Sequence, residues 1–552
     1  MNIGMNFVKK ILRSLFVFSL FFAQNAFVLD ADDVMFDDSI MYDDIDVFDD
    51  PDIDNFLDTT EFDVKVTDPK TIVDILIDLA KADKLLQEDI YLKTSPLNKR
   101  NILDYPEYIS DKDYRFGDWV VGSHIFYNQT SRMFFCRQSD CISSYLNITG
   151  SSLLGRLEEI EEEIKPILPD FDFDIVRGLS LFQNATVQDR RVGALIYGFR
   201  DFDGIHFKFK IPLAWRERNY FLTCAEREAL EREFGAMDPD EEDEFACKYI
   251  ISDRLGFGDL RLSIAFPIRN EIRDLDFRVG AYTTVPLNFT IIEGIKGRVF
   301  RKKKCRPTIS FTDLFDLAQD PNTQEEALKM VFDFGIGALE GLSSILLDTR
   351  LGNDRNLGIG ILLHSKTPIR LVIKRAWAQK LFWKSRMTFE YLLPDRQKRC
   401  FIKIDDSEEF ESRDFTDDEK AAENLAFLER KFVEKFYPFV FDARVHPGIV
   451  FMWTSKLSYE SKRFGFDLGW DTWIRSGERL RKVYASKGVL PCLDVEKARR
   501  RFAYQWKPFG SIFYKARRPN KEIIISLSGD GTFASSGIGK DFSIALGIES
   551  NF

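Results

Sequence analysis

The sequence predicts a mostly β protein: one large antiparallel barrel of about 12–16 strands, with helical loop inserts and an acidic N-terminal extension. Many segments after residue 113 alternate apolar and polar residues over roughly 9 to 13 positions, longer than the usual soluble strand of about 5 or 6. Short polar turns alternate with long inserts along the same region. No run of 18 or more apolar residues follows the N-terminal region, which excludes a helical membrane protein. Because a tilted strand crosses a bilayer in about 9 to 11 residues, these lengths favour a transmembrane barrel.

Residues 1–26 have the pattern of a secretory signal peptide. Two lysines and an arginine precede an apolar run at residues 15–22, and the small residues Ala23 and Ala26 follow it. The apolar run is too short to span a bilayer. We therefore expect export, with cleavage near Ala26.

An acidic extension is predicted over residues 27–66. Residues 30–63 hold fourteen Asp and Glu61 but no Lys or Arg, so the net charge of −12 originates in this segment. Such charge density resists collapse, and we expect disorder. Aspartate oxygens are ligands for Ca²⁺, but no calcium-loop motif is present, so neither a metal site nor a cofactor is predicted.

A periplasmic helix or plug-like segment is predicted over residues 67–112. Apolar residues recur on one helical face in residues 69–91, and Asp68 before Pro69 is a good start signal for a helix. We expect this helix to lie in the periplasm or under the mouth of the barrel. The alternative is a helix of an ordinary soluble domain.

The barrel itself is predicted over residues 113–552. Its candidate strands share an alternating pattern and lie at residues 115–128, 171–182, 191–199, 204–215, 260–266, 277–289, 357–363, 369–377, 387–393, 448–459, 464–474, 511–516, 522–528 and 540–552. Helical inserts are predicted between them, at residues 151–167, 225–234, 311–332 and 417–436.

The clearest internal strand, residues 204–215, supplies candidates for the lumen wall. His206, Lys208 and Lys210 alternate with apolar residues and share one face. Because lumen faces are polar and rings of charge set ion selectivity, we expect these side chains to line a solute path. Four further candidates for the same wall are Arg370, Lys374, Asp467 and Asp471. The alternative is the solvated face of a soluble sheet.

The last strand ends on an aromatic residue. Ile544, Leu546 and Ile548 alternate with small or polar residues, and the chain stops on Phe552 in the same phase. This segment resembles the C-terminal signature strand of Gram-negative outer-membrane β-barrels, a porin-like class. The resemblance implies that the barrel insertion machinery reads these four residues, and that the protein resides in lipid of the outer membrane.

Seven cysteines are present, and an exported chain meets an oxidising compartment. Cys136 and Cys141 are close enough to close a small loop, and Cys224 and Cys247 bracket an acidic insert. We expect disulfides in surface loops, with connectivity open. Neither spacing matches a zinc pattern.

No catalytic motif is present, so the sequence predicts that the chain is not an enzyme. The four histidines lie far apart, and the signatures of zinc proteases, serine hydrolases and P-loop enzymes do not occur. His364 and Ser365 are neighbours, but adjacent residues of a strand face opposite sides. Nothing indicates nucleic-acid binding.

The sequence therefore favours passive or facilitated passage of small solutes across an outer membrane. A non-transporting surface or adhesion protein anchored by its barrel is the first alternative. The second is a secreted β-rich glycoprotein, because four N-x-S/T triplets begin at Asn128, Asn147, Asn184 and Asn288.

Overall fold

The computed structural model divides the chain into two units, Met1–Asp46 and Val47–Phe552. All described residues belong to the second unit: 96–105, 119–131, 187–202, 204–220, 222, 251–268, 275–287, 289–293, 349–371, 373, 375–402, 439–518, 521–551, and scattered positions between 313 and 347 and at 430 and 433. The predicted signal peptide, acidic extension, helix 69–91 and strand 171–182 lie outside these residues.

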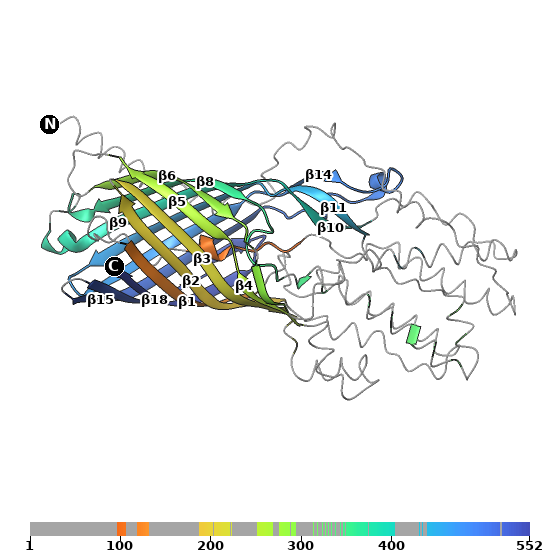
Figure 1. Cartoon of the computed structure of the whole chain (residues 1–552), viewed down its shortest axis with the longest axis horizontal. Helices are drawn as coiled ribbons and strands as arrows, with labels where there is room; N and C mark the ends of the chain where they lie inside the picture. The colour runs from red at the N-terminus through yellow and green to blue at the C-terminus, as the bar shows by residue number, and fades with distance from the viewer. Residues whose placement is uncertain are drawn as a thin grey trace. The chain divides into compact units, whose positions relative to one another are not determined.

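Twelve strands close into an antiparallel barrel, as the sequence predicts. The ring is completed where the strand at residues 188–202 pairs with the strand at residues 205–219. In order around the wall they are β2 (Gln188–Phe202), β1 (Trp119–Ser131), β18 (Lys540–Asn551), β16 (Lys521–Gly531), β15 (Ala503–Arg518), β13 (Phe464–Arg475), β12 (Ile449–Glu460), β9 (Leu381–Leu392), β8 (Gly358–Pro368), β6 (Asp276–Val285), β5 (Leu260–Pro267) and β3 (Ile205–Asn219). Figure 1 shows these strands tilted in one direction.

Shorter elements extend this wall. β4 (Ile251–Phe257) and β7 (Phe289–Glu293) continue the sheet beyond β3, and β17 (Ala534–Ser536) pairs with β15. β10 (Asp395–Phe401), β11 (Phe439–His446) and β14 (Arg479–Val483) form a separate three-stranded sheet, the extension sheet, around Phe401, Ala443 and Val483. The described 3₁₀ turns are η1 (Ile102–Asp104), η5 (Ile369–Leu371), η6 (Ala376–Lys380) and η7 (Leu490–Cys492).

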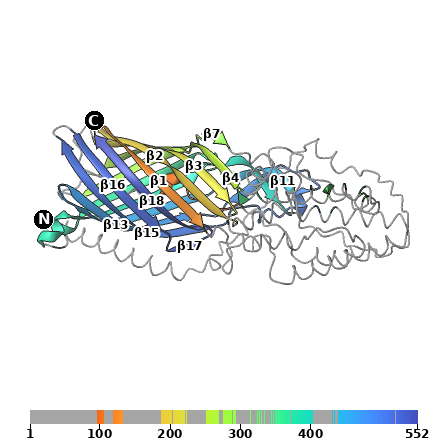
Figure 2. The same ribbon diagram turned by 90° about the horizontal axis from the view of Figure 1, so that it is seen from below.

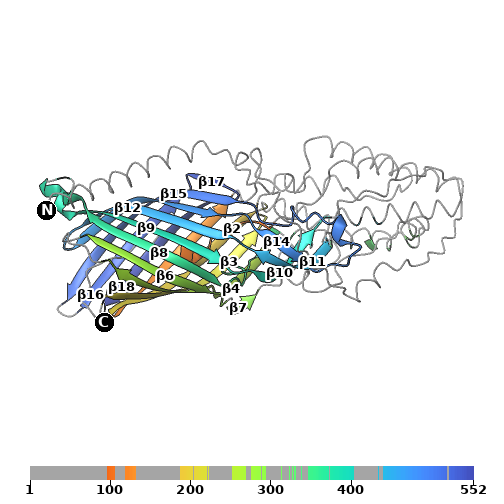
Figure 3. The same ribbon diagram turned by 90° about the horizontal axis from the view of Figure 1, so that it is seen from above.

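The two ends of the barrel differ in the length of their connections. β2–β3, β12–β13 and β15–β16 are joined by two or three residues at one end, here the short end, where the β5–β6 and β8–β9 connections also lie. The opposite, long end carries the connections that contain β4, β7 and the three strands of the extension sheet (Figures 2 and 3). β1 begins and β18 finishes at the short end. Outer-membrane barrels show this asymmetry, with short periplasmic turns and long outer loops.

The outer surface is apolar and the inner face is polar. On β18 the outward side chains Phe542, Ile544, Leu546 and Ile548 are 43 to 53% exposed. Their neighbours, such as Ser543 and Glu549, are buried inside the barrel. A period of two produces this separation because successive side chains point to opposite faces. An apolar exterior of this kind suits the hydrocarbon of a bilayer.

Two predicted strands differ from the structure. Residues 369–377 form η5 and then η6 instead of a strand, because β8 already spans the wall when it reaches Pro368, and the chain must reverse to pair Pro368 with Phe382. Residues 277–289 form β6 and β7 instead of one strand. β6 finishes at Val285 because Pro286, which follows it, has no N–H to donate to a ladder.

Helix occurs at the described positions between 313 and 346 except Thr323, which lies in a turn, and at 430 and 433. No helix among the described residues is long and apolar enough to cross a bilayer.

Candidate functional site

A short segment of the N-terminal region occupies the lumen. Residues 96–105, here the plug, contain η1, and Asn98, Arg100, Leu103 and Asp104 are each no more than 6% exposed. Asn101 caps η1 by accepting a hydrogen bond from the Leu103 N–H. Described partners of the plug lie on β2, β5, β13, β15 and β18. The plug is thus bonded to strands from different sides of the wall.

Arg100 is the most connected plug residue. Its guanidinium pairs with Asp471 of β13 at 2.5 Å and donates to Gln505 of β15 at 3.2 Å. Arg191 of β2 donates to the Arg100 carbonyl at 2.8 Å. Arg100 and Asp471 are both 1% exposed in their side chains. Breaking a pair buried this deeply typically costs about 3–5 kcal/mol, because one charge is left uncompensated.

Arg261 of β5 holds the other side of η1. Its guanidinium contacts Asp104 at 2.7 Å and Glu390 of β9 at 2.9 Å, and donates to the Leu103 carbonyl at 3.1 Å. Each of these partners is buried. The turn is therefore held by buried salt bridges and hydrogen bonds rather than by apolar packing alone. Local sequence patterns do not reveal these contacts, because their partners lie far apart in the chain.

A second ionic cluster ties the plug to the connections at the long end. Lys99 pairs with Asp354 at 2.6 Å, and Arg500 bridges Asp354 and Glu478. Burial would raise the pKa of the Glu478 carboxyl, but Arg399, Arg500 and Arg475 outweigh it and lower that pKa to about 2. Glu478 is thus held ionised between β13 and the extension sheet.

Asp259 contacts the middle of the plug through Asn101. Its Oδ2 accepts hydrogen bonds from the Asn101 side chain at 2.8 Å and from the Asn353 N–H at 2.7 Å. Burial raises the pKa of the Asp259 carboxyl to about 7 against these contacts and the charge of Lys99. Gly352, with a φ of +73°, lies so close that a Cβ there would be 2.0 Å from Asp259 Oδ1. This turn therefore requires glycine.

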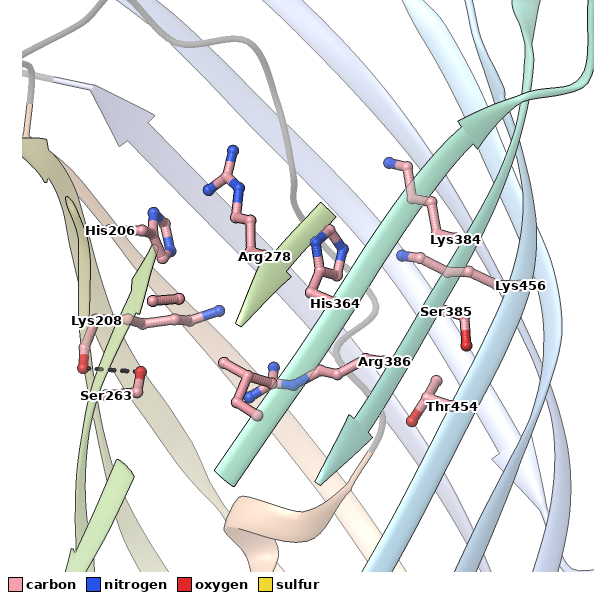
Figure 4. Close-up of a pocket in the computed structure, with 12 residues that line it drawn as sticks. His206, Lys208, Ser263, Arg278, His364, Lys384, Ser385, Arg386, Thr454 and Lys456 are labelled. Carbon is pink, nitrogen blue, oxygen red and sulfur yellow. Dashed lines mark hydrogen bonds between the residues drawn. The ribbon is translucent and has the colours of Figure 1, made fainter. Parts of the chain in front are cut away.

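A cavity of about 60 Å³ lies in the lumen between the plug and the short end. Strands β3, β5, β6, β8, β9 and β12 supply its lining: His206, Lys208, Ser263, Ala265, Arg278, Leu362, His364, Lys384, Ser385, Arg386, Thr454 and Lys456. Figure 4 shows Lys208 directed toward Arg386 and Lys456 across this space, with the pale orange turn of η1 below. The volume holds a few water molecules.

The strand register sets the cavity's basic side chains beside one another. His364 lies opposite Arg278 on one neighbouring strand and opposite Arg386 on the other. Lys384 lies opposite both Lys366 and Lys456. Like charges directly opposite one another destabilise a sheet unless counter-charges offset them.

Glu460, Asp467, Asp276 and Asp201 contact cations of the cavity without belonging to its described lining. Lys384 pairs with Glu460 at 2.6 Å, and Lys456 pairs with Asp467 at 2.9 Å. Arg278 pairs with Asp276 at 2.9 Å and with Asp201 at 3.9 Å. Asp276 and Asp201 have side chains 27% and 39% exposed, so water screens them. The described lining itself has five cations, two imidazoles and no carboxylate.

The predicted lumen residues fall in different places. His206, Lys208 and Lys210 lie on the inner side of β3, but only the first two line the cavity. Asp467 and Asp471 lie on the inner side of β13 and are at most 4% exposed. They contact Lys456 and Arg100, respectively, so their partners are the wall and the plug.

Arg370 was predicted wrongly to line the lumen. It is exposed in η5, because β8 stops at Pro368 before reaching it. The remaining candidates lie outside the described residues: Lys374, Phe552, Cys136, Cys141, Cys224 and Cys247.

Sequence reasoning missed the larger part of the cavity wall. Lys384 and Arg386 alternate with outward residues, but the predicted strand begins at residue 387 and leaves both out. Arg278 and Lys456 lie inside predicted strands and His364 directly follows one, and nothing local distinguishes them from solvated polar side chains. No group of three His, Cys, Asp or Glu side chains that could hold a metal is found in the described part of the chain.

The chain matches no protein-family model and no curated protein. It is similar in fold to an outer membrane channel from Pseudomonas putida F1, with 8% identity, 80% of this chain and 100% of that chain covered, and a TM-score of 0.37. The Pseudomonas putida toluene transporter TodX is 7% identical, with 79% of this chain and 89% of that chain covered and a TM-score of 0.31. A Pseudomonas aeruginosa FadL homologue is 7% identical, with 80% of this chain and 90% of that chain covered and a TM-score of 0.25. These values are too low for the likeness to say anything of function.

Proposed function

We propose that this chain is a bacterial outer-membrane barrel that allows small solutes to pass, and that the plug closes its lumen until the plug moves. The observation that carries the proposal is a closed barrel with an apolar exterior and a charged interior. A barrel of this kind encloses a route between two aqueous spaces only if it spans a bilayer. The proposal assigns no catalytic role.

The plug supports gating rather than free diffusion. Residues 98–104, all buried except the half-buried Ile102, lie in the lumen and bond to the wall through Arg100, Asp104 and Asn101. Because the bonds are ionic and not apolar, a charged solute can compete with them. Passage then requires the plug to shift or to leave part of the cross-section open.

Planar-bilayer recordings of the purified full chain test the proposal. Arg100→Ala removes the pair with Asp471, so we expect more frequent or larger openings than in the wild type, because the plug is held less firmly. Arg396→Ala, which removes an exposed pair with Asp442 in the extension sheet, is the matched control and should conduct like the wild type.

A plugged lumen also suits a surface protein that uses its barrel only as an anchor. No conductance in the wild type, in Arg100→Ala or after deletion of residues 96–105 would favour that function and contradict passage. The secreted glycoprotein is disfavoured because Asn128 is 2% exposed on the inner side of β1, where it donates to the Phe542 carbonyl at 3.0 Å.

A further inference from the structure

We propose that the lumenal cavity is a binding site for small oxyanions, carrying a carboxylate or a phosphate group. The inference rests on the proposed function, because it names the class of solute that the path would take. Its basis is the set of five cations that four strands, β3, β6, β9 and β12, place around one cavity, and no single strand supplies it.

The first argument is charge. Lys208, Lys384 and Lys456 are 5 to 8% exposed and lie at or beside a cavity with no carboxylate in its described lining. Glu460, Asp467, Asp276 and Asp201 contact three of the cations from outside the lining and offset part of their repulsion. In a low-dielectric wall a cluster of cations attracts an anion more strongly than it would in water.

The second argument is register. Arg278, His364 and Arg386 form one row across three strands, and Lys366, Lys384 and Lys456 form the next row. All of these side chains except Lys366 line the cavity, and they suit the several oxygens of a carboxylate or a phosphate, which accept charge-assisted hydrogen bonds from guanidinium and ammonium groups. A bound oxyanion would relieve the repulsion between Lys384 and Lys456, which lie directly opposite each other.

The third argument is that the wall is polar on most sides but not on all. Ala265 and Leu362 belong to the lining, and with Tyr282 they form a small apolar cluster. Ser263 and Thr454 add hydroxyl groups. The site therefore fits a compact anion with a small apolar part at least as well as a bare mineral ion.

Calorimetric titration of the folded full chain in detergent at low ionic strength tests the site. Inorganic phosphate and acetate are the two anionic probes, and tetramethylammonium is the cationic control. We expect one or both anions to bind and the cation not to bind. Affinity should fall as sodium chloride rises, since the site is electrostatic. Comparing the two anions tells the phosphate group from the carboxylate.

Two variants locate the site. Lys208→Gln and Arg386→Gln should each weaken anion binding about tenfold, the size expected for one lost charged hydrogen bond. Lys515→Gln, which changes a lysine buried on the inner side of β15 outside the cavity lining, should bind like the wild type. Heat-modifiable mobility in a gel verifies that each variant is folded.

Several outcomes overturn the inference. They are no anion binding by the wild type, equal binding of tetramethylammonium, or an equal loss in Lys515→Gln. If both cavity variants fail to fold, the wild type alone decides through its salt dependence and its preference for anions over the cation. Conductance without anion binding would support the proposed passage of solutes and contradict the anion site. Anion binding without conductance would support the site and contradict passage.

Discussion

At the scale of single residues, the position of the plug depends on buried ionisable groups. Arg100, Asp104 and Asp259 each contact groups on the wall or in its connections, and none is more than 3% exposed. Groups buried this completely are costly unless every charge is matched. We therefore expect the plug to respond to pH and to single substitutions more than the barrel wall does.

Asp259 gives the pH prediction. Its pKa of about 7 in the folded state lies above the usual value of 3.8, so the folded protein keeps a proton that the unfolded chain releases between about pH 4 and 7. Its contribution to stability is present below pH 4 and is lost as the pH rises toward 7, by at most about 1.4 kcal/mol per pH unit. Thermal unfolding in detergent from pH 4 to 8 measures this loss.

Asp259→Asn is the matched variant for that measurement. Asparagine keeps an oxygen that can accept from Asn101 and Asn353 but carries no titrating proton. The variant should therefore have a flatter stability profile between pH 4 and 7. If its profile has the same slope as the wild type, another group titrates in this window and the assignment to Asp259 is wrong.

At the scale of elements, β18 illustrates how a strand serves lipid on one side and the lumen on the other. Leu546 is 46% exposed on the outside, whereas Ala545 is 5% exposed on the inside. The strand pairs with β16 and β1, so it is the seam at which the last and first strands of the chain meet. Substitutions on β18 can therefore examine either the outer or the inner face of the barrel wall.

Leu546→Lys should destabilise the barrel by roughly 2–4 kcal/mol if Leu546 lies near the bilayer midplane, because a charge replaces an apolar side chain in lipid. Leu546→Val is the control and should cost less than about 1.5 kcal/mol. Denaturant unfolding in lipid vesicles measures both variants. Equal stability of the lysine variant and the wild type would contradict a lipid-facing surface.

The end of the same element carries the prediction about assembly. Phe552 lies outside the described residues, and its role follows from the resemblance of the last strand to the terminal strands that the insertion machinery reads. Deletion of Phe552 should lower the amount of folded, heat-modifiable protein in cells, whereas Phe552→Tyr, which keeps the aromatic ring, should not. Unchanged amounts after deletion would count against an assembly signal, since a soluble protein tolerates loss of a terminal residue.

At the scale of the whole molecule, the apolar band and the alternation of short and long connections predict residence in an outer membrane, with the short end in the periplasm. Membrane fractionation of a Gram-negative host followed by protease treatment of intact cells measures this. We expect recovery with the outer membrane and cleavage in the connections of the long end. Recovery in the soluble periplasm would refute a membrane-spanning barrel.

The sequence by itself determined the barrel and the direction of its side chains. The alternation in residues 204–215, 464–474 and 540–552 decides which side chains point inward, because strand geometry has a period of two and no partner is needed to read it. His206, Lys208, Asp467 and Asp471 were found in this way. Strand limits were less accurate, so Lys384 and Arg386 were missed and Arg370 was included.

Only the tertiary structure decided where the plug lies and which charges meet. Arg100 and Asp471 are 371 residues apart in the chain, and Arg261 and Asp104 are 157 apart. No local period links such pairs. The two basic rows of the cavity likewise depend on the register between β6, β8, β9 and β12, which hydrogen bonding between strands sets. A strand's own pattern gives its two faces, but only its neighbours give its height in the wall.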